Sequence, residues 1–271
     1  MSHTVLAELG FLAPSDKKPV YFASQAGADA ELNIAAKITP HSVTILDARA
    51  MTPAPTLDKE GFALAAHASS VSDFYDDEQI RNIYEDEVVT LVRAVTGASK
   101  VVVFDNTRRS DATDVRGTRN TREPSAVVHN DYTDDSARKR LRDILPAAEA
   151  DQRLQSRFAI INVWRSIAGP VLTTPLAFCD ATSVREADLI ATERRAKDRI
   201  GELQLVTFHP DQRWFWFSAL TRDEAILLKT FDSDSGGRAR RSVHTAFANP
   251  EAPAGAQPRE SIETRTLVFF D

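Results

Sequence analysis

Apolar residues follow two different spacings along the chain, and each spacing predicts a different kind of element. At residues 76–97 they recur every three to four positions, which predicts an amphipathic helix that an aspartate caps and Gly97 ends. A similar pattern predicts a helix from Asp134 towards Pro146. A further helix is expected to start at Ser183, whose spacing to a glutamate matches a capping box, and to end before Gly201.

Short runs rich in β-branched and aromatic residues predict strands, because turn-forming residues separate them. A buried strand is expected at 101–104, and six more at 158–164, 203–208, 213–218, 226–231, 241–247 and 261–270. Many short strands with few helices predict a mainly β fold with flanking helices, closed or built from two sheets. At this length we expect one domain, residues 1–271, with a supporting region at 1–100 and the functional core at 101–271.

Composition excludes several classes of protein. The chain has 271 residues and a net charge of −6, and this mild acidity argues against a general nucleic-acid binder. Its one cysteine, Cys179, excludes an internal disulfide framework, a cysteine-rich zinc site and a cysteine-ligated cluster. The longest uncharged run, residues 166–179, contains two prolines and is shorter than the about 18 residues of a membrane span. Because no export-signal pattern is visible, we expect a cytoplasmic protein without a membrane partner.

Histidines are the main candidates for chemistry, since the familiar enzyme motifs are missing. The sequence has no glycine pattern for dinucleotides or phosphates, no Gly-x-Ser-x-Gly and no His-Glu-x-x-His. Two of the six histidines open a His-x-Asp triplet, His129–Asn130–Asp131 and His209–Pro210–Asp211. The second triplet contains a proline and lies between two predicted aromatic strands, so we interpret it as a hairpin turn.

The first triplet is the better candidate for a metal site. His129 follows an apolar, strand-like approach, and residues two apart on a strand point to the same side, so His129 and Asp131 would face one site. His244, in another strand-like segment, offers a third ligand. Two histidines and one carboxylate on one side of ferrous iron leave positions open for O2 and a chelating co-substrate. The alternative is that His244 is a hydrogen-bonded residue of the wall.

A basic pair near the C-terminus adds to this picture. Arg259 and Ser261 alternate onto one side of a predicted strand. A guanidinium presents a planar fork to a carboxylate, and a neighbouring hydroxyl adds a donor. The pair would hold the far carboxylate of 2-oxoglutarate while the keto-acid end chelates iron. An ordinary surface ion pair of Arg259 or Arg265 with Glu263 is the alternative.

Six segments, in matching order over about residues 100–271, together resemble a known family. The chain resembles the Fe(II)/2-oxoglutarate-dependent oxygenases related to the cephalosporin 7α-methoxylase accessory chain (CmcJ) and to fungal gibberellin-desaturase-like enzymes. The segments that carry the resemblance are 128–133, 162–165, 212–214, 228–233, 244–247 and 258–265.

The resemblance implies a double-stranded β-helix, the jelly-roll core that is also found in cupins. It implies that His129, Asp131 and His244 bind iron and that Arg259, helped by Ser261, binds 2-oxoglutarate. The implied reaction uses Fe(II), 2-oxoglutarate and O2 to hydroxylate or desaturate a small molecule of specialised metabolism, and it releases succinate and CO2. The loop 249–258 lengthens the gap between His244 and the arginine, which leaves the choice between Arg259 and Arg265 open.

Other functions with the same ligands stay open at this level. A cupin-like isomerase or hydrolase would use zinc, nickel or manganese, but it would give Arg259 and Ser261 no role. A non-catalytic jelly-roll binding protein would make the ligand set accidental. The sequence predicts no oligomeric state.

The candidates for contacts with substrate are Trp164, Arg165 and Tyr132, although Arg165 would equally suit a structural pair. Two groups of arginines precede the metal-ligand candidates, one at 108–122 and one at 238–241. If both groups flanked one cavity mouth they would favour an anionic substrate. Interleaved aspartates favour a solvated loop instead.

Overall fold

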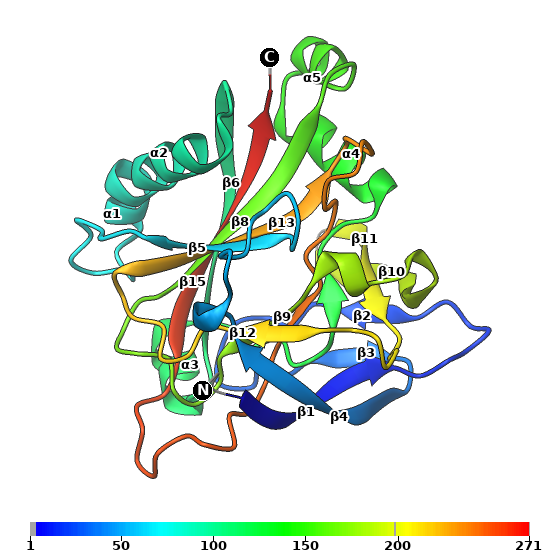
Figure 1. Ribbon diagram of the computed structural model, residues 1–271. Helices are drawn as coiled ribbons and strands as arrows, with labels where there is room; N and C mark the ends of the chain where they lie inside the picture. The colour runs from blue at the N-terminus through cyan, green and yellow to red at the C-terminus, as the bar shows by residue number, and fades with distance from the viewer. Residues whose placement is uncertain (1–3, 198, 271) are drawn as a thin grey trace.

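Two β-sheets with helices on the outside make up the computed structural model, which describes residues 4–197 and 199–270 (Figure 1). The larger sheet has ten strands in the order β1-β4-β12-β9-β14-β7-β11-β10-β2-β3. Their bounds are β1 Thr4–Leu12, β2 Val20–Phe22, β3 Asn33–Ala35, β4 Ile38–Asp47, β7 His129–Asn130, β9 Leu176–Cys179, β10 Leu189–Ala196, β11 Arg199–Val206, β12 Trp214–Trp216 and β14 His244–Ala246. The smaller sheet has the order β5-β13-β8-β15-β6, with β5 Phe62–Ala66, β6 Lys100–Ser110, β8 Phe158–Ser166, β13 Glu224–Asp232 and β15 Glu260–Phe269.

The chain passes repeatedly between the sheets, and this gives the jelly roll. After β6 in the smaller sheet come β7 in the larger, β8 in the smaller and β9 in the larger. After the β10–β11 insertion and β12, the strands β13, β14 and β15 alternate between the sheets again. Neighbours within β6-β15-β8-β13 and within β7-β14-β9-β12 are all antiparallel. The predicted mainly β, double-stranded β-helix fold is confirmed.

Every residue of β8 is buried, because this strand is covered on both faces. Its outer face, with Ile161 and Val163, packs under the helical segment that contains Tyr84 and Val88. Its inner face carries Trp164, which packs with Phe178 and other residues between the sheets. Alternate positions along one strand therefore belong to different cores.

The helix predicted at 76–97 is confirmed. It consists of α1 Asp77–Gln79, a π-helical turn Ile80–Tyr84 and α2 Glu85–Thr96. The Asp76 carboxylate accepts hydrogen bonds from the Glu78 and Gln79 amides, and Gly97 ends the helix with φ 69°. The predicted helix from Asp134 is α4 Asp134–Ile144, and α3 Thr113–Arg119 and α5 Ala147–Arg153 are two helices that the pattern did not predict.

Replacing Asp76 by alanine is expected to lower the free energy of unfolding, because the cap satisfies helix amides that otherwise have no partner. Denaturant unfolding curves of the variant and of the unmodified protein measure the loss of stability. Asp86→Ala, at an exposed position inside α2, is the matched control and is expected to change stability by less than about 0.5 kcal/mol. Equal losses in both variants would contradict the capping role.

The helix predicted from Ser183 to before Gly201 is wrong. This segment forms two short 3-10 turns, Ala181–Ser183 and Glu186–Asp188, and then the antiparallel hairpin β10–β11. The Ser183 hydroxyl accepts from the Arg213 amide and donates to the Asp180 carbonyl oxygen, so it caps no helix. Strand pairing of β10 with β11 and with β2 outweighs the helix propensity of its Ala, Glu and Arg residues.

Residues before 100 complete both sheets. β1 and β4 pair with each other, and β4 pairs with β12, so they extend the sheet that contains β7 and β14. β5 forms one edge of the smaller sheet. Among the described residues, no helix is long and apolar enough to span a membrane.

Candidate active site

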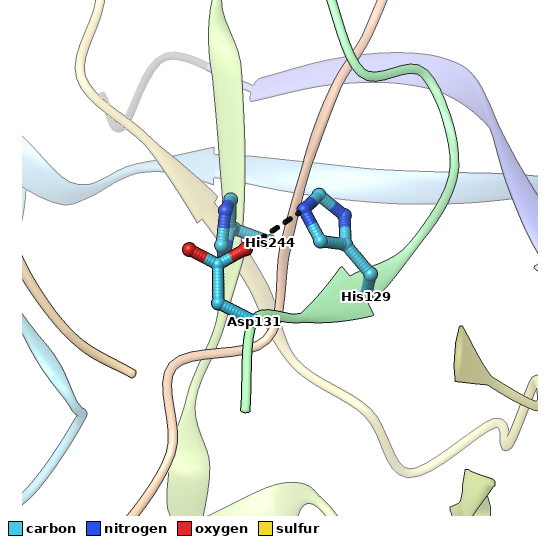
Figure 2. Close-up of side chains that lie close together, drawn as sticks. All are labelled: His129, Asp131 and His244. Carbon is cyan, nitrogen blue, oxygen red and sulfur yellow. Dashed lines mark ion pairs between the residues drawn. The ribbon is translucent and has the colours of Figure 1, made fainter. Parts of the chain in front are cut away.

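His129 and His244 lie opposite each other on the neighbouring strands β7 and β14. Their rings are 4.5 Å apart between centroids, and both side chains are buried. Asp131 follows β7, and Figure 2 shows its carboxylate turned towards both rings. One ligand atom from each of the three residues lies within 4.8 Å of the other two. The structure therefore brings the three predicted ligands together.

Backbone hydrogen bonds determine which ring nitrogen of each histidine is free. His129 Nδ1 is 2.8 Å from the carbonyl oxygen of Val127, and His244 Nδ1 is 2.8 Å from that of Ser242. Because a carbonyl oxygen only accepts, each Nδ1 carries a proton, so Nε2 is the nitrogen of each ring that is available to a metal. Burial, and then the electrostatic interaction with the neighbouring His244, lowers the pKa of His129 to about 3. The His129 imidazole is therefore neutral, as a metal ligand must be.

The Asp131 carboxylate is held by one of its oxygens. Oδ2 accepts hydrogen bonds from Asn162 Nδ2 at 2.8 Å and from Arg265 Nε at 3.3 Å. Oδ1 lies 3.6 Å from His129 Nε2 (Figure 2). Burial raises the pKa of Asp131, but the charge of Arg265, the two histidines and the Asn162 hydrogen bond together bring it well below its usual value. The group is ionised, and Oδ1 is the oxygen that faces the histidines.

Arg265 is surrounded by carboxylates. Its Nη1 donates to Asp105 at 2.6 Å and its Nη2 to Glu263 at 2.5 Å, while Nε donates to Asp131. Burial lowers the pKa of Arg265, but these three carboxylates, Glu263 first, raise it well above the usual value. All three guanidinium nitrogens are engaged, so Arg265 positions Asp131.

Arg259 has a different environment. Its side chain is buried, Nε donates to Ser261 Oγ at 3.1 Å, and Nη1 donates to the Thr174 carbonyl oxygen at 2.9 Å. The guanidinium lies 4.9 Å from the Trp164 ring centroid. Burial, and then the positive charge of Arg109, lowers the pKa of Arg259 to about 9, so it remains charged at neutral pH. Within residues 4–197 and 199–270, no carboxylate lies within 4.0 Å of this guanidinium, so an incoming anion would stabilise it.

Both arginines belong to the same wall as Asn162. Positions 261, 263 and 265 alternate onto one face of β15, and Arg265 and Glu263 pair in register with Asn162 and Trp164 of β8. The contact of Asn162 and Arg265 with Asp131 shows that this face points to the three converging side chains. Two imidazoles, one carboxylate and a buried cation thus share the interior between the sheets.

The three residues predicted to contact the substrate lie in different places in the structure. Tyr132 lines the cavity that also contains His129 and Asp131, and Trp164 packs against Arg259. Arg165 lies on the outer face of β8, where it donates to the His67 carbonyl oxygen and sits 5.5 Å from the Tyr84 ring centroid. The structure therefore places Arg165 away from the cavity that His129 and Asp131 line, because its neighbour Trp164 occupies the inner face.

The second His-x-Asp triplet is a turn, as predicted, but it is not a hairpin, because β11 before it and β12 after it are not neighbours in the sheet. The Gln212 amide donates to the His209 carbonyl oxygen at 3.1 Å, and the Asp211 side chain is exposed. Asn162, in contrast, was missed as a functional residue. A signal was available, since it is a polar side chain inside an otherwise apolar predicted strand.

Comparison with known proteins agrees with this geometry. A family model described as an oxidoreductase/YMDC permease-like domain (YDMC) matches residues 9–269. The hydroxylase/desaturase CTB9 of Cercospora beticola is 38% identical over 237 residues, which cover 79% of this chain and 72% of that protein. The Fe(II)/2-oxoglutarate-dependent dioxygenase nvfI of Aspergillus novofumigatus is 34% identical over 241 residues, 85% of this chain and 84% of that protein.

A solved structure shares the whole fold. The iron and alpha-ketoglutarate-dependent endoperoxidase NvfI superposes with a TM-score of 0.85 at 29% identity, and the match covers 98% of each chain. These relatives are oxygenases, which favours that class over the isomerase, hydrolase and binding-protein alternatives. The chain belongs to the hydroxylase/desaturase family of Fe(II)/2-oxoglutarate-dependent oxygenases.

Proposed function

We propose that His129, Asp131 and His244 hold the Fe(II) of this oxygenase through His129 Nε2, His244 Nε2 and Asp131 Oδ1. One observation carries the proposal: the three ligand atoms converge within 4.8 Å, and both Nδ1 atoms are already bonded to carbonyl oxygens. The donor set suits ferrous iron, because two imidazoles and one carboxylate leave the remaining positions to the co-substrate and O2. This facial arrangement was also implied by the resemblance.

We propose further that Arg259, with Ser261, binds the far carboxylate of 2-oxoglutarate. The buried guanidinium of Arg259 has no carboxylate partner among the described residues, whereas that of Arg265 already has three. Ser261 holds the guanidinium through Nε, and Trp164 packs against it. A charged fork in this setting gives a charge-assisted contact with a carboxylate.

The residues of the chain have separable tasks in the proposed reaction. When bound, iron and 2-oxoglutarate supply the oxidising chemistry, in which 2-oxoglutarate and O2 give succinate and CO2 while the substrate is hydroxylated or desaturated. Asn162 and Arg265 hold Asp131 in place, and the hydrogen bonds at Nδ1 orient the histidine rings. Tyr132 contacts the small-molecule substrate from the wall of the cavity.

The proposed unit of function is the whole chain, residues 1–271. Support comes from β1 and β4, which extend the sheet that carries His129 and His244, and from Tyr21, which lines the cavity beside His129. The region 1–100 then completes the site as well as the fold.

Anaerobic addition of Fe(II) and 2-oxoglutarate tests the proposal. A keto acid that chelates ferrous iron gives a visible charge-transfer absorption, and admission of O2 should then yield succinate. The expected result is an absorption that needs both components and disappears when O2 is consumed. An apoprotein that binds neither Fe(II) nor 2-oxoglutarate would contradict it.

Replacing Asn162 by leucine is expected to weaken Fe(II) binding by about 10–100-fold, because the Asp131 carboxylate loses the donor that orients it. Equilibrium titration with Fe(II) under anaerobic conditions measures the loss. Asn106→Leu is the matched control, since Asn106 bonds Glu85 and Thr264 on the far side of the sheet. Unchanged iron affinity in Asn162→Leu would contradict the positioning role.

A further inference from the structure

The cavity that His129 and Asp131 line has more basic than acidic side chains in its wall. Seven basic and four acidic side chains line it. The predicted arginine groups contribute unequally: Arg109 and Arg122 line this cavity, whereas Arg240 and Arg241 of the second group lie elsewhere and pair with Asp134. The two groups therefore do not flank one mouth.

The acidic residues of the cavity already have partners. Asp105 pairs with Arg265 at 2.6 Å, Asp143 with Lys139 at 2.7 Å, and Glu202 with Lys18 at 2.9 Å. Asp131 accepts from Asn162 and Arg265 and faces the proposed iron. Each of the four therefore has a nearer partner than the remaining arginines, and only the charge of Asp105 also acts on Arg122 among the described residues.

Five arginines of the cavity make no ion pair with any carboxylate of residues 4–197 and 199–270, and one of them, Arg140, lies over the Phe104 ring. The other four form an arginine cluster: Arg109 on β6, Arg122 after α3, Arg194 on β10 and Arg199 on β11. The only side-chain hydrogen bond found for the cluster in the described chain joins Arg109 Nη1 to the Glu123 carbonyl oxygen at 2.7 Å. Several of the guanidinium groups therefore keep donors for a ligand.

Burial and mutual repulsion act together on the cluster. Burial lowers the pKa of Arg122, and the charge of Arg109 lowers it further. Burial also lowers the pKa of Arg194, with further contributions from Arg265, Arg199 and Arg122. Half-buried cations that repel one another destabilise the folded chain, and an anion bound between them offsets this repulsion.

Building on the proposed iron site, we propose that the substrate of this oxygenase is an organic anion whose carboxylate or phosphate group binds to the arginine cluster. The same cavity contains His129 and Asp131, so an anchored substrate would extend its carbon skeleton towards the iron ligands. Leu203 and Tyr132 supply apolar and aromatic wall for that skeleton. The anchor would thereby select which C–H bond is presented for hydroxylation or desaturation.

Matched probes of one shape test the charge requirement. Calorimetry under anaerobic conditions, on protein loaded with Fe(II) and 2-oxoglutarate, would compare 2-naphthoate, 2-naphthyl phosphate and the neutral 2-naphthamide. Either anion is expected to bind at least about 10-fold more tightly than the amide, and the better of the two identifies the anionic group. Equal binding of the amide would overturn the proposal.

Variants then locate the site. The double replacement Arg122→Gln and Arg194→Gln is expected to weaken binding of the better anion by about 10–100-fold, while the charge-transfer absorption with Fe(II) and 2-oxoglutarate persists. Arg195→Gln is the matched control, because Arg195 is the next residue of β10, is about half exposed and pairs with Glu193. Unchanged anion affinity in the double variant would overturn the proposal.

The same measurements separate this proposal from the proposed iron site. If the double variant loses 2-oxoglutarate affinity instead, the cluster serves the co-substrate and the substrate proposal is overturned. If the unmodified protein gives no charge-transfer absorption, the iron and 2-oxoglutarate proposal fails, whatever the probes show.

Discussion

Replacing His129, Asp131 or His244 by alanine is expected to abolish tight Fe(II) binding and 2-oxoglutarate-dependent succinate formation. Each residue supplies one of three ligand atoms that converge within 4.8 Å. Loss of an outer hydrogen-bond partner of a metal ligand costs about 10–100-fold in affinity, so loss of a ligand itself should cost more. Anaerobic titration with Fe(II), followed by succinate measurement, gives both readouts.

Two comparisons make this result specific. His209→Ala removes the other histidine of a His-x-Asp triplet, which lies in a turn, and is expected to retain iron binding and turnover. Asp131→Asn keeps the shape of the side chain and removes its charge, so it tests the ligand even if an alanine variant unfolds. Full iron affinity in Asp131→Asn or in a folded histidine variant would contradict the assignment.

The second large effect is expected at Arg259. Replacing it by leucine should raise the 2-oxoglutarate concentration for half-maximal turnover by on the order of 100-fold, with Fe(II) affinity unchanged. The physical reason is the loss of a buried charge-assisted contact, which is worth about 2–5 kcal/mol. Arg259→Lys keeps the charge without the planar fork and should give an intermediate value.

Arg265 offers the contrasting variant. Arg265→Leu leaves the carboxylates of Asp131, Glu263 and Asp105 without their shared cation, so we expect weaker iron binding and lower stability. Measuring Fe(II) affinity and the 2-oxoglutarate requirement on both variants separates the two roles. A rise in the 2-oxoglutarate requirement with normal iron binding in Arg265→Leu alone would reverse the assignment.

Much of the fold was readable from local patterns, and the errors have local causes. Strands such as β8 and β15 lie where the β-branched and aromatic runs placed them. The alternation of Val5, Ala7, Leu9 and Phe11 was also a readable strand signal, but it was missed. The helix prediction failed at residues 189–196. Their helix-forming residues are held in a strand by pairing with segments elsewhere in the sequence, and a local pattern does not contain that pairing.

The site shows the same division between local and distant information. Spacing alone predicted that His129 and Asp131 face one side. The pairing that sets His129 opposite His244 joins two strands that are far apart in the sequence, so a local pattern does not contain it. Alternation on a strand already shows that Trp164 and Arg165 face opposite sides, so the two could not both face the interior between the sheets. Positions 259 and 265 are an even number of residues apart, so strand alternation predicts the same face for both arginines. Only the side chains that each guanidinium contacts in the structure distinguish their roles.

A crystal structure of the protein soaked anaerobically with Fe(II) and 2-oxoglutarate tests the central claim most directly. We predict metal density bonded to His129 Nε2, His244 Nε2 and Asp131 Oδ1, chelated by the keto-acid end of 2-oxoglutarate, with the far carboxylate on Arg259 and Ser261. Metal bound at other side chains, or two imidazoles that make no bond to it, would contradict the account.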